Sequence, residues 1–252
     1  MNAKLKGIGL STLLAGSLSV FAATVQAADI KVMSDSPLEP ALTKVVDLYQ
    51  RQTHNQVSLV FDPSPAVKKR IEGGEAADVV IVQPDFAEDL AKSGKVSAGD
   101  RPTIAHVGVG LGNRTDGPAY DISTEEKLRD TLLGADLIVF NNVKSGQAFA
   151  NAIEHLGIAE TLKPKILRTT PNGIFEPVLK GKGNDMVAGT IPLIATTSGI
   201  KLLGPLPGDL QSTLTYTAAL MANTSQRDAA EGFIKFLVSP EAKEAFAANG
   251  AK

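Results

Sequence analysis

The feature that most constrains the fold is a regular alternation of strand and helix patterns between residues 29 and 83. Segments 29–34, 56–62 and 77–83 are rich in β-branched and apolar residues and predict strands. Between them, residues 40–53 and 65–74 carry apolar side chains at helical spacing. The third strand, ADVVIVQ, is apolar almost throughout, which is typical of a strand with helices on both faces. Short loops between alternating strands and helices therefore predict an α/β fold with a parallel sheet.

A second set of strand and helix patterns begins near residue 106. Strands are predicted at 106–112, 136–142, 185–190, 199–207 and 214–222, and helices at 123–133 and 146–157. The first of these helices is expected to open on a capping box formed by Ser123 and Glu126. Residues 226–250 predict two helices that are broken at Pro240. No low-complexity linker separates the two sets, so two lobes would be joined directly by strands.

Residues 1–27 have the pattern of a secretory signal peptide. Lys4 and Lys6 precede an apolar stretch, residues 8–22, and Val25-Gln26-Ala27 fits the small-x-small rule for cleavage. The stretch is shorter than the roughly 20 residues that span a bilayer, and the sequence has no cysteine for a lipid anchor. We therefore expect cleavage after Ala27 and export to the periplasm.

The composition argues against several classes of function. A hydrophobic content of 43% and a net charge of −2 are ordinary for a globular protein and do not favour binding to nucleic acid or to a membrane surface. His54, His106 and His155 are scattered, and there is no cysteine, so no metal site or cofactor is predicted. No G-x-S-x-G elbow is present, and an enzyme is not the favoured hypothesis.

Two further patterns bear on ligand binding. The stretch GVGLGN, residues 108–113, resembles a phosphate loop, but it lies inside a Val-rich strand pattern and predicts a strand that permits close backbone approach. In addition, four polar turns open predicted helices, at Ser36, at Ser64, at Ser145-Gly146, and at Thr169-Thr170 with Asn172. Such turns present free N–H groups and the positive end of a helix dipole. One turn is explained by capping alone, whereas four at equivalent strand ends predict an anion site.

Four stretches resemble the periplasmic molybdate-binding proteins and the wider group of two-lobed, type II solute-binding proteins of ABC importers. They are IKVMSDSPLEPAL, VSLVFDPSPAVKKRIEGGEAADVVIV, SGQAFANAIEHLGIAETLKPKI and FIKFLVSPEAKEAF. The resemblance spans nearly the whole chain after residue 28. It implies a type II periplasmic binding fold in which each of two lobes is a mostly parallel sheet flanked by helices. The lobes would comprise residues 28–105, completed by 216–252, and residues 106–215, with hinges near 104–110 and 213–219.

The resemblance also implies an anion site built from hydroxyl and main-chain N–H groups of four loops. The second-loop serine of the family matches Ser64, whereas the first-loop position falls on Pro37, so that hydroxyl would come from Ser36. The third and fourth loops supply main-chain groups, and a tyrosine of many members is replaced here by threonine. The complete set of predicted ligand-binding residues is Ser36, Ser64, Ser145, Gly146, Arg168, Thr170, Asn172 and Thr190.

Charged residues beside these turns leave the ligand open. Asp35 and Asp62 would repel an oxyanion in a partly dry cleft, and they are expected to turn outward to cap or pair. Lys144 and Arg168 flank the turns of the second lobe, where an arginine could fork a carboxylate. The first hypothesis is a molybdate- or tungstate-like oxyanion, the alternative is a small di- or tricarboxylate or another organic anion, and an extracytoplasmic enzyme is the third. We expect a monomer that docks on an ABC importer permease.

Overall fold

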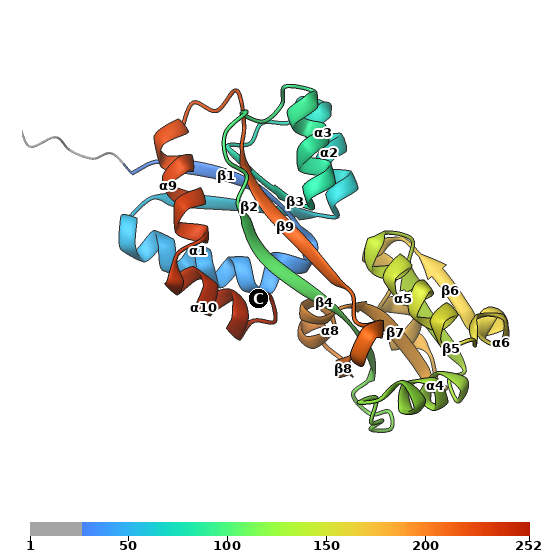
Figure 1. Ribbon diagram of the computed structural model, residues 1–252. Coiled ribbons are helices and arrows are strands. Elements are labelled where there is room, and N and C mark those ends of the chain that lie inside the picture. The colour runs from blue at the N-terminus through green and yellow to red at the C-terminus, as the bar shows by residue number, and fades with distance from the viewer. Residues whose placement is uncertain (1–26) are drawn as a thin grey trace, which may run out of the picture.

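Two lobes are joined by two long strands, β4 (Thr103–Arg114) and β9 (Thr213–Leu220), which pair in antiparallel fashion (Figure 1). The computed structural model describes residues 27–252, so the predicted signal peptide lies almost entirely outside the described residues. The first half of β4 pairs with β9, and its second half pairs with strands of the other lobe. The lobes are therefore connected by continuous strands, as the lack of a linker predicted. The residues at which one lobe ends and the other begins stay a prediction.

The first lobe holds a sheet in the order β2-β1-β3-β9, in which the first three strands are parallel. Its strands are β1 (Asp29–Asp35), β2 (Gln56–Asp62) and β3 (Val79–Val82). Its helices are α1 (Glu39–Thr53), α2 (Ser64–Glu72), α3 (Pro84–Lys92), α9 (Arg227–Leu237) and α10 (Pro240–Ala248). Helices α2 and α3 cover one face, and α1, α9 and α10 cover the other (Figure 1).

Strand β3 shows why its sequence is apolar without alternation. Val79 and Ile81 pack into the core beneath α1, whereas Val80 and Val82 pack beneath α2 and α3. All four side chains are fully buried. The prediction that helices cover both faces of this strand is therefore confirmed.

The second lobe continues the sheet in the order β4-β7-β5-β6, with β8 paired to the other edge of β4. Its strands are β5 (Leu137–Asn141), β6 (Ile166–Thr169), β7 (Asp185–Thr190) and β8 (Ile200–Pro205). Its helices are α4 (Glu125–Leu133), α5 (Lys144–His155), α6 (Ala159–Leu162), α7 (Glu176–Lys180) and α8 (Ile191–Thr196). Single 3₁₀ turns lie at Ser36–Leu38, Lys163–Lys165, Pro171–Gly173 and Gly208–Leu210.

The stretch GVGLGN lies within β4, and its glycines permit the close packing that the sequence predicted. A Cβ atom on Gly110 would lie 2.8 Å from the carbonyl oxygen of Gly204, and one on Gly112 would lie 2.6 Å from Ile194. These contacts leave no room for a side chain where β8 and α8 cross β4. The phosphate-loop alternative is wrong.

Three predicted helix starts differ from the structure. Ser36 belongs to a 3₁₀ turn, and α1 begins at Glu39, so Ser36 does not open the α-helix directly. Helix α4 is capped by Thr124, which accepts from the N–H of Lys127, because Ser123 is held in a turn by Asp121. Pro63 is the N-cap of α2, so Ser64 is its first helical residue rather than its cap. Strand β6 and helices α3 and α8 were not predicted.

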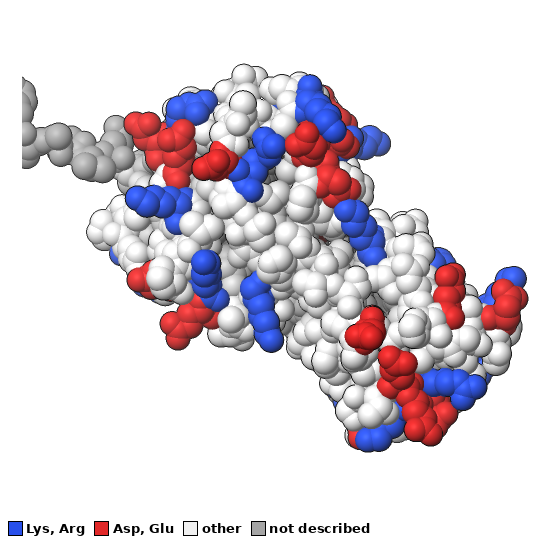
Figure 2. Space-filling view, viewed as in Figure 1, with Lys and Arg blue, Asp and Glu red and all other residues white. Residues whose placement is uncertain are grey.

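Neither sign of charge dominates the face of the molecule shown in Figure 2. On the face in Figure 2, acidic and basic side chains are interspersed, and the junction between the lobes is mostly uncharged. Within residues 27–252, no helix is both long and apolar enough to span a bilayer.

Candidate ligand-binding cleft

A cavity of about 350 Å³ lies between the two lobes, within the range of about 300–1,000 Å³ typical of small-molecule sites. It is formed by the carboxyl ends of β1, β3, β5 and β7 and by the helices or turns that follow them. This is where ligands bind in open parallel sheets. Of the eight predicted site residues, five line the cavity: Ser36, Ser64, Ser145, Asn172 and Thr190.

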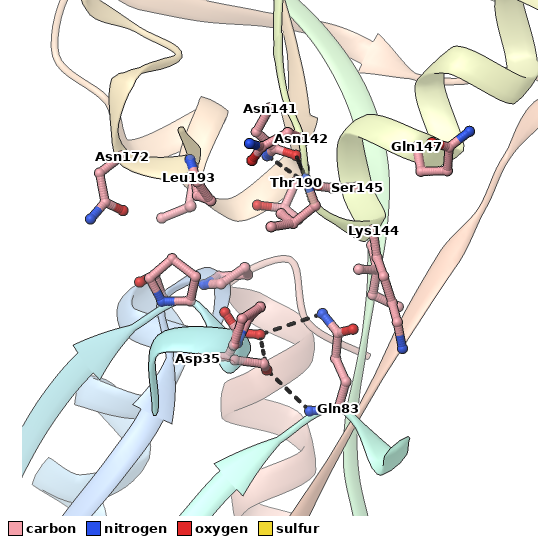
Figure 3. Close-up of a pocket in the computed structure, with 18 of the residues that line it drawn as sticks. Asp35, Gln83, Asn141, Asn142, Lys144, Ser145, Gln147, Asn172, Thr190 and Leu193 are labelled. Atoms are coloured by element: carbon pink, nitrogen blue, oxygen red, sulfur yellow. Dashed lines mark hydrogen bonds between the residues drawn. The ribbon is translucent and has the colours of Figure 1, made fainter. Parts of the chain in front are cut away.

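A buried carboxylate, Asp35, forms the floor of the cavity in the first lobe (Figure 3). It is the last residue of β1 and is only 3% exposed. The Ser64 hydroxyl donates to its Oδ2 atom, and Gln83 Nε2 donates to the same oxygen at 3.4 Å. The Ser64 oxygen in turn accepts from the N–H of Gln83 at 3.2 Å. Ser64 thus has both a donor and an acceptor inside the protein, and its hydroxyl proton is directed at Asp35 rather than at the cavity.

The environment of Asp35 favours its neutral form. Burial raises the pKa of Asp35 from 3.8 to about 6, because the carboxylate loses its hydration. The Ser64 hydroxyl and amide, the Gln83 side chain and the Ser36 amide act in the opposite direction and lower the pKa. Desolvation is the larger effect, so this carboxyl group changes its charge close to physiological pH. The expectation that Asp35 turns outward is wrong.

Asp62 behaves as predicted. It is the partner of Asp35 in the β1–β2 register, but its side chain pairs with Arg70 at 2.8 Å. Arg70 is held at the same time by Glu75 at 2.7 Å. Neither Asp62 nor Arg70 lines the cavity, so this ion pair does not contribute to the cleft.

Two more polar groups on the floor have no partner. The Tyr216 hydroxyl, from β9, is fully buried and lines the cavity, yet within residues 27–252 it makes no hydrogen bond. The same holds for Gln83 Oε1. Burial, and secondarily the negative charge of Asp35, raise the pKa of Tyr216 well above 10. The nearby Gln83 side chain acts in the opposite direction and lowers this pKa, but burial is the larger effect, so Tyr216 is neutral. A buried hydroxyl without a partner costs about 1–3 kcal/mol.

In the second lobe, the side chain of Asn141, the last residue of β5, binds N–H groups at the start of α5. Its Oδ1 atom accepts from the N–H groups of Val143 at 3.1 Å and Gly146 at 3.0 Å, and its Nδ2 atom donates to the Ser145 hydroxyl at 2.9 Å (Figure 3). A Cβ atom on Gly146 would lie 1.8 Å from the Asn141 carbonyl oxygen, so only glycine fits there. The Gly146 amide, which was expected to meet a ligand, is thus already used by the chain.

Further polar residues of the second lobe line the cavity. Thr190, at the end of β7, is 3% exposed, and its hydroxyl has no partner within the described residues. Asn142, Gln147 and Asn172 also line the cavity (Figure 3). Lys144 crosses between the lobes to Asp85 of α3 at 2.6 Å and lies 5.5 Å from the centre of the Phe86 ring.

Three predicted residues do not reach the cavity. Gly146 packs against Asn141 instead, as described above. Arg168 is exposed on β6, with its guanidinium 4.4 Å from the centre of the Phe140 ring. Thr170 is exposed and precedes the 3₁₀ turn at residue 171, where its carbonyl accepts from Gly173. The turn brings Asn172 to the cavity and leaves Thr170 behind it.

Sequence reasoning missed the residues that define the floor. Gln83 and Tyr216 stand in strand patterns and carry no local signal of function, because their convergence depends on β3 and β9 lying side by side. Asn141 had a weak signal, since it ends a predicted strand four residues before Ser145. Asp35 was noticed, but its orientation could not be read from the sequence.

The two lobes and the cleft between them define a type II periplasmic binding fold. The chain overlaps a periplasmic molybdate-binding protein of Azotobacter vinelandii with a TM-score of 0.74, at 19% identity and covering 88% of this chain and 98% of that one. It also overlaps the substrate-binding domain of a putative molybdenum ABC transporter from Clostridium difficile with a TM-score of 0.70, at 17% identity and covering 90% and 99%.

The chain belongs to the family of bacterial extracellular solute-binding proteins, whose family model matches residues 30–252. Proteins of this family bind small ligands and deliver them to ABC permeases. Among curated proteins, the chain is 22% identical to an aconitate isomerase of a Pseudomonas species, over 99% of this chain and 97% of the relative. The resemblance to periplasmic solute-binding proteins predicted from the sequence is confirmed.

Proposed function

We propose that this protein captures a small organic acid, such as a di- or tricarboxylate or a hydroxy acid, in the interlobe cleft and delivers it to an ABC importer permease. The observation that carries the proposal is the position of Asp35. Two like unit charges about 4 Å apart repel by about 4 kcal/mol at an effective dielectric constant of 20. The repulsion between Asp35 and a dianionic oxyanion would be about twice as large. An organic acid can instead turn a hydroxyl or a protonated carboxyl group toward Asp35.

The other walls of the cavity suit such a ligand. Tyr216 and Thr190 line the cavity, and within the described residues their hydroxyl groups have no hydrogen-bond partner. The cavity also has an apolar wall, against which the carbon skeleton of the ligand would pack; it is formed by Phe86, Leu193 and Leu214. Lys144 is the cationic side chain among the described lining residues, and it can stabilise a carboxylate near α5.

In this proposal the two lobes bind the ligand one after the other. The ligand first contacts one lobe, and rotation about β4 and β9 near residues 104–110 and 213–219 then brings the second set of donors to it. The Lys144–Asp85 contact would form on closure, since its two partners lie in different lobes. The closed, liganded monomer is the form that docks on the permease.

A ligand-binding experiment tests this proposal. Thermal melts are recorded with a panel of di-, tri- and hydroxycarboxylates, and calorimetry follows on each compound that shifts the midpoint. A ligand at 100 times its Kd adds about 2.7 kcal/mol, which raises the midpoint of a chain of this size by about 5–10 °C. Absence of a shift with every carboxylate would refute the proposal.

A matched pair of lysine variants sharpens the test. Lys144→Met should weaken the ligand found above by about tenfold or more, because it removes the cation from the cavity lining. Lys127→Met is the control. Lys127 lies on α4, is exposed to a similar extent, pairs with Asp121 and does not line the cavity. Equal affinities in the two variants would remove Lys144 from the site.

A second function is favoured by Asp35 together with the relative named aconitate isomerase. A buried carboxylate whose pKa is raised to about 6 can accept a proton from an allylic carbon of an unsaturated tricarboxylate. The C–H electron pair would shift the double bond, and Asp35 would return the proton to the other end of the allylic system. Incubation with each aconitate isomer in D₂O, followed by NMR, tests this. Binding without isomerisation or deuterium incorporation would leave the transport function alone.

A further inference from the structure

We propose that Asp35 is an internal anion that occupies the anion position of the first lobe and thereby excludes tetrahedral oxyanions from the cleft. This inference rests on the proposed function, because it explains why the site selects an organic acid. It makes Asp35 the residue that determines specificity and predicts that its removal creates an oxyanion site.

The donors of the first lobe all act on this one carboxylate. The Ser64 hydroxyl and the Gln83 side chain donate to Oδ2, and the amides of Ser36 and Ser64 lower the pKa of the group. These donors come from the ends of β1, β2 and β3, which are far apart in sequence and adjacent in the sheet. Together they resemble the shell that a bound anion requires.

Prolines prevent these turns from serving a second anion. Pro37 follows Ser36 and Pro65 follows Ser64, and proline has no N–H group. The next amides of α2, those of Ala66 and Val67, already donate to the Pro63 carbonyl at 2.8 and 3.0 Å. An external anion could therefore replace the Asp35 carboxylate, but it could not bind beside it.

Two buried hydroxyl groups beside the cavity have no partner among the described residues, which supports a ligand-binding role for this floor. Tyr216 is fully buried with its hydroxyl unpartnered among the described residues, and Thr190 on the opposite wall is in the same condition. Both line the cavity. Hydroxyl groups of this kind are normally satisfied, so their partner is expected to be the bound solute.

Asp35 also lacks the compensation that a structural carboxylate has. Within residues 27–252, it forms no ion pair with Lys, Arg or His, whereas its register partner Asp62 is paired with Arg70. Burying an unpaired charge is costly. Ligand selection would explain why this cost is retained. The negative charge of Asp35 repels oxyanions that would otherwise bind the donors around it.

The test is a gain of function. Sulfate and tungstate are titrated by calorimetry into the wild-type protein and into Asp35→Ser, which removes the carboxylate and frees its donors. Asp35→Asn, which keeps the shape and removes the charge, is measured alongside, and Asp62→Asn is the control at the equivalent strand end. We expect no binding at millimolar oxyanion to the wild type or to Asp62→Asn, and at least a tenfold gain in affinity in Asp35→Ser.

Two results would overturn the inference: binding of sulfate or tungstate to the wild type at micromolar concentration, or a folded Asp35→Ser that gains nothing. If Asp35→Ser fails to fold, the wild type still provides a test, because lowering the pH from 7 to 5 protonates Asp35 and should raise its sulfate affinity. The groups near Asp35 are Ser64 of α2, Gln83 and the neutral Tyr216. Lys144 lies across the cleft, and its partner Asp85 is on α3 of the same lobe as Asp35. A sulfate affinity that stays flat with pH would then refute the inference.

The outcome can be separated from that of the proposed function. The carboxylate panel on the wild-type protein tests whether an organic acid binds, and it does not depend on any oxyanion result. Carboxylate binding together with no oxyanion gain in Asp35→Ser would refute only the role of Asp35. An oxyanion gain without carboxylate binding would refute only the proposed ligand class.

Discussion

Replacing Asp35 by asparagine should change how the stability of the protein depends on pH. The folded state holds the Asp35 proton with a pKa of about 6, whereas the ordinary value is 3.8. Below pH 3.8 the group is protonated in both states, and its contribution to stability is fully present. Between these values the folded state keeps a proton that the unfolded state releases, so stability falls as the pH rises. Above pH 6 the contribution is lost.

The size of this effect follows from the difference between the two pKa values. Each pH unit of difference is worth about 1.36 kcal/mol, so a change from 3.8 to about 6 corresponds to about 3 kcal/mol. The group is almost completely buried, and solvent screening therefore does not reduce this value much. Asparagine cannot ionise. We expect Asp35→Asn to match the wild type near pH 4 and to exceed it by up to about 3 kcal/mol at pH 8.

Urea unfolding at pH 4, 6 and 8 measures this difference directly. In a parallel thermal melt at pH 8, the midpoint of the variant should be higher by about 6–12 °C, taking about 2–4 °C per kcal/mol for a chain of this length. Other carboxylates titrate in both proteins and cancel in the comparison, and Asp62→Asn controls for the loss of a carboxylate at a strand end. A wild-type-minus-variant difference that is constant from pH 4 to 8 would show that Asp35 is not desolvated in the folded protein.

Three further predictions concern the walls of the cleft. Gly146→Ala should destabilise the protein by about 3 kcal/mol or more in urea unfolding, since the new Cβ atom would collide with the Asn141 carbonyl, whereas Gly99→Ala, with nothing within 4 Å, should cost little. Tyr216→Phe should stabilise the ligand-free protein by about 1 kcal/mol and weaken the ligand in calorimetry, because it removes a buried hydroxyl that has no protein partner among the described residues; a less stable variant with unchanged affinity would contradict this. Asn141→Ala should cost about 1–2 kcal/mol in the same unfolding assay, because two N–H groups of the first turn of α5 lose their acceptor, and an unchanged midpoint would argue against that cap.

The local patterns of the chain were sufficient for most of the fold. Strands β1, β2, β3 and β7 fall within two residues of their predicted bounds, because their β-branched runs are short and end at turn residues. The break at Pro240 is confirmed, with Ser239 capping the last helix. Helix α8 was missed because IPLIAT is too short for a helical period, and its formation depends on packing against β4 and β8.

The candidate site was less predictable than the fold. Its location at the carboxyl ends of the strands could be predicted, because parallel strands align these ends in space. The roles of its residues could not. Ser64 was expected to donate to a ligand and instead donates to Asp35, and Gly146 was expected to offer an amide that Asn141 already accepts. Each of these outcomes depends on the direction of a neighbouring side chain.

The sequence by itself determined the class of fold and the part of it where a ligand would bind, because strand and helix periodicity and turn residues act over a few positions of the chain. Only the tertiary structure decided what occupies the donors there. Asp35, Ser64, Gln83 and Tyr216 come from four separate elements, and they meet because β1, β3 and β9 are neighbours in one sheet. Their distance from water, which sets the pKa of Asp35 and leaves the Tyr216 hydroxyl without a partner, is a property of the packed lobes and has no counterpart in the order of the residues.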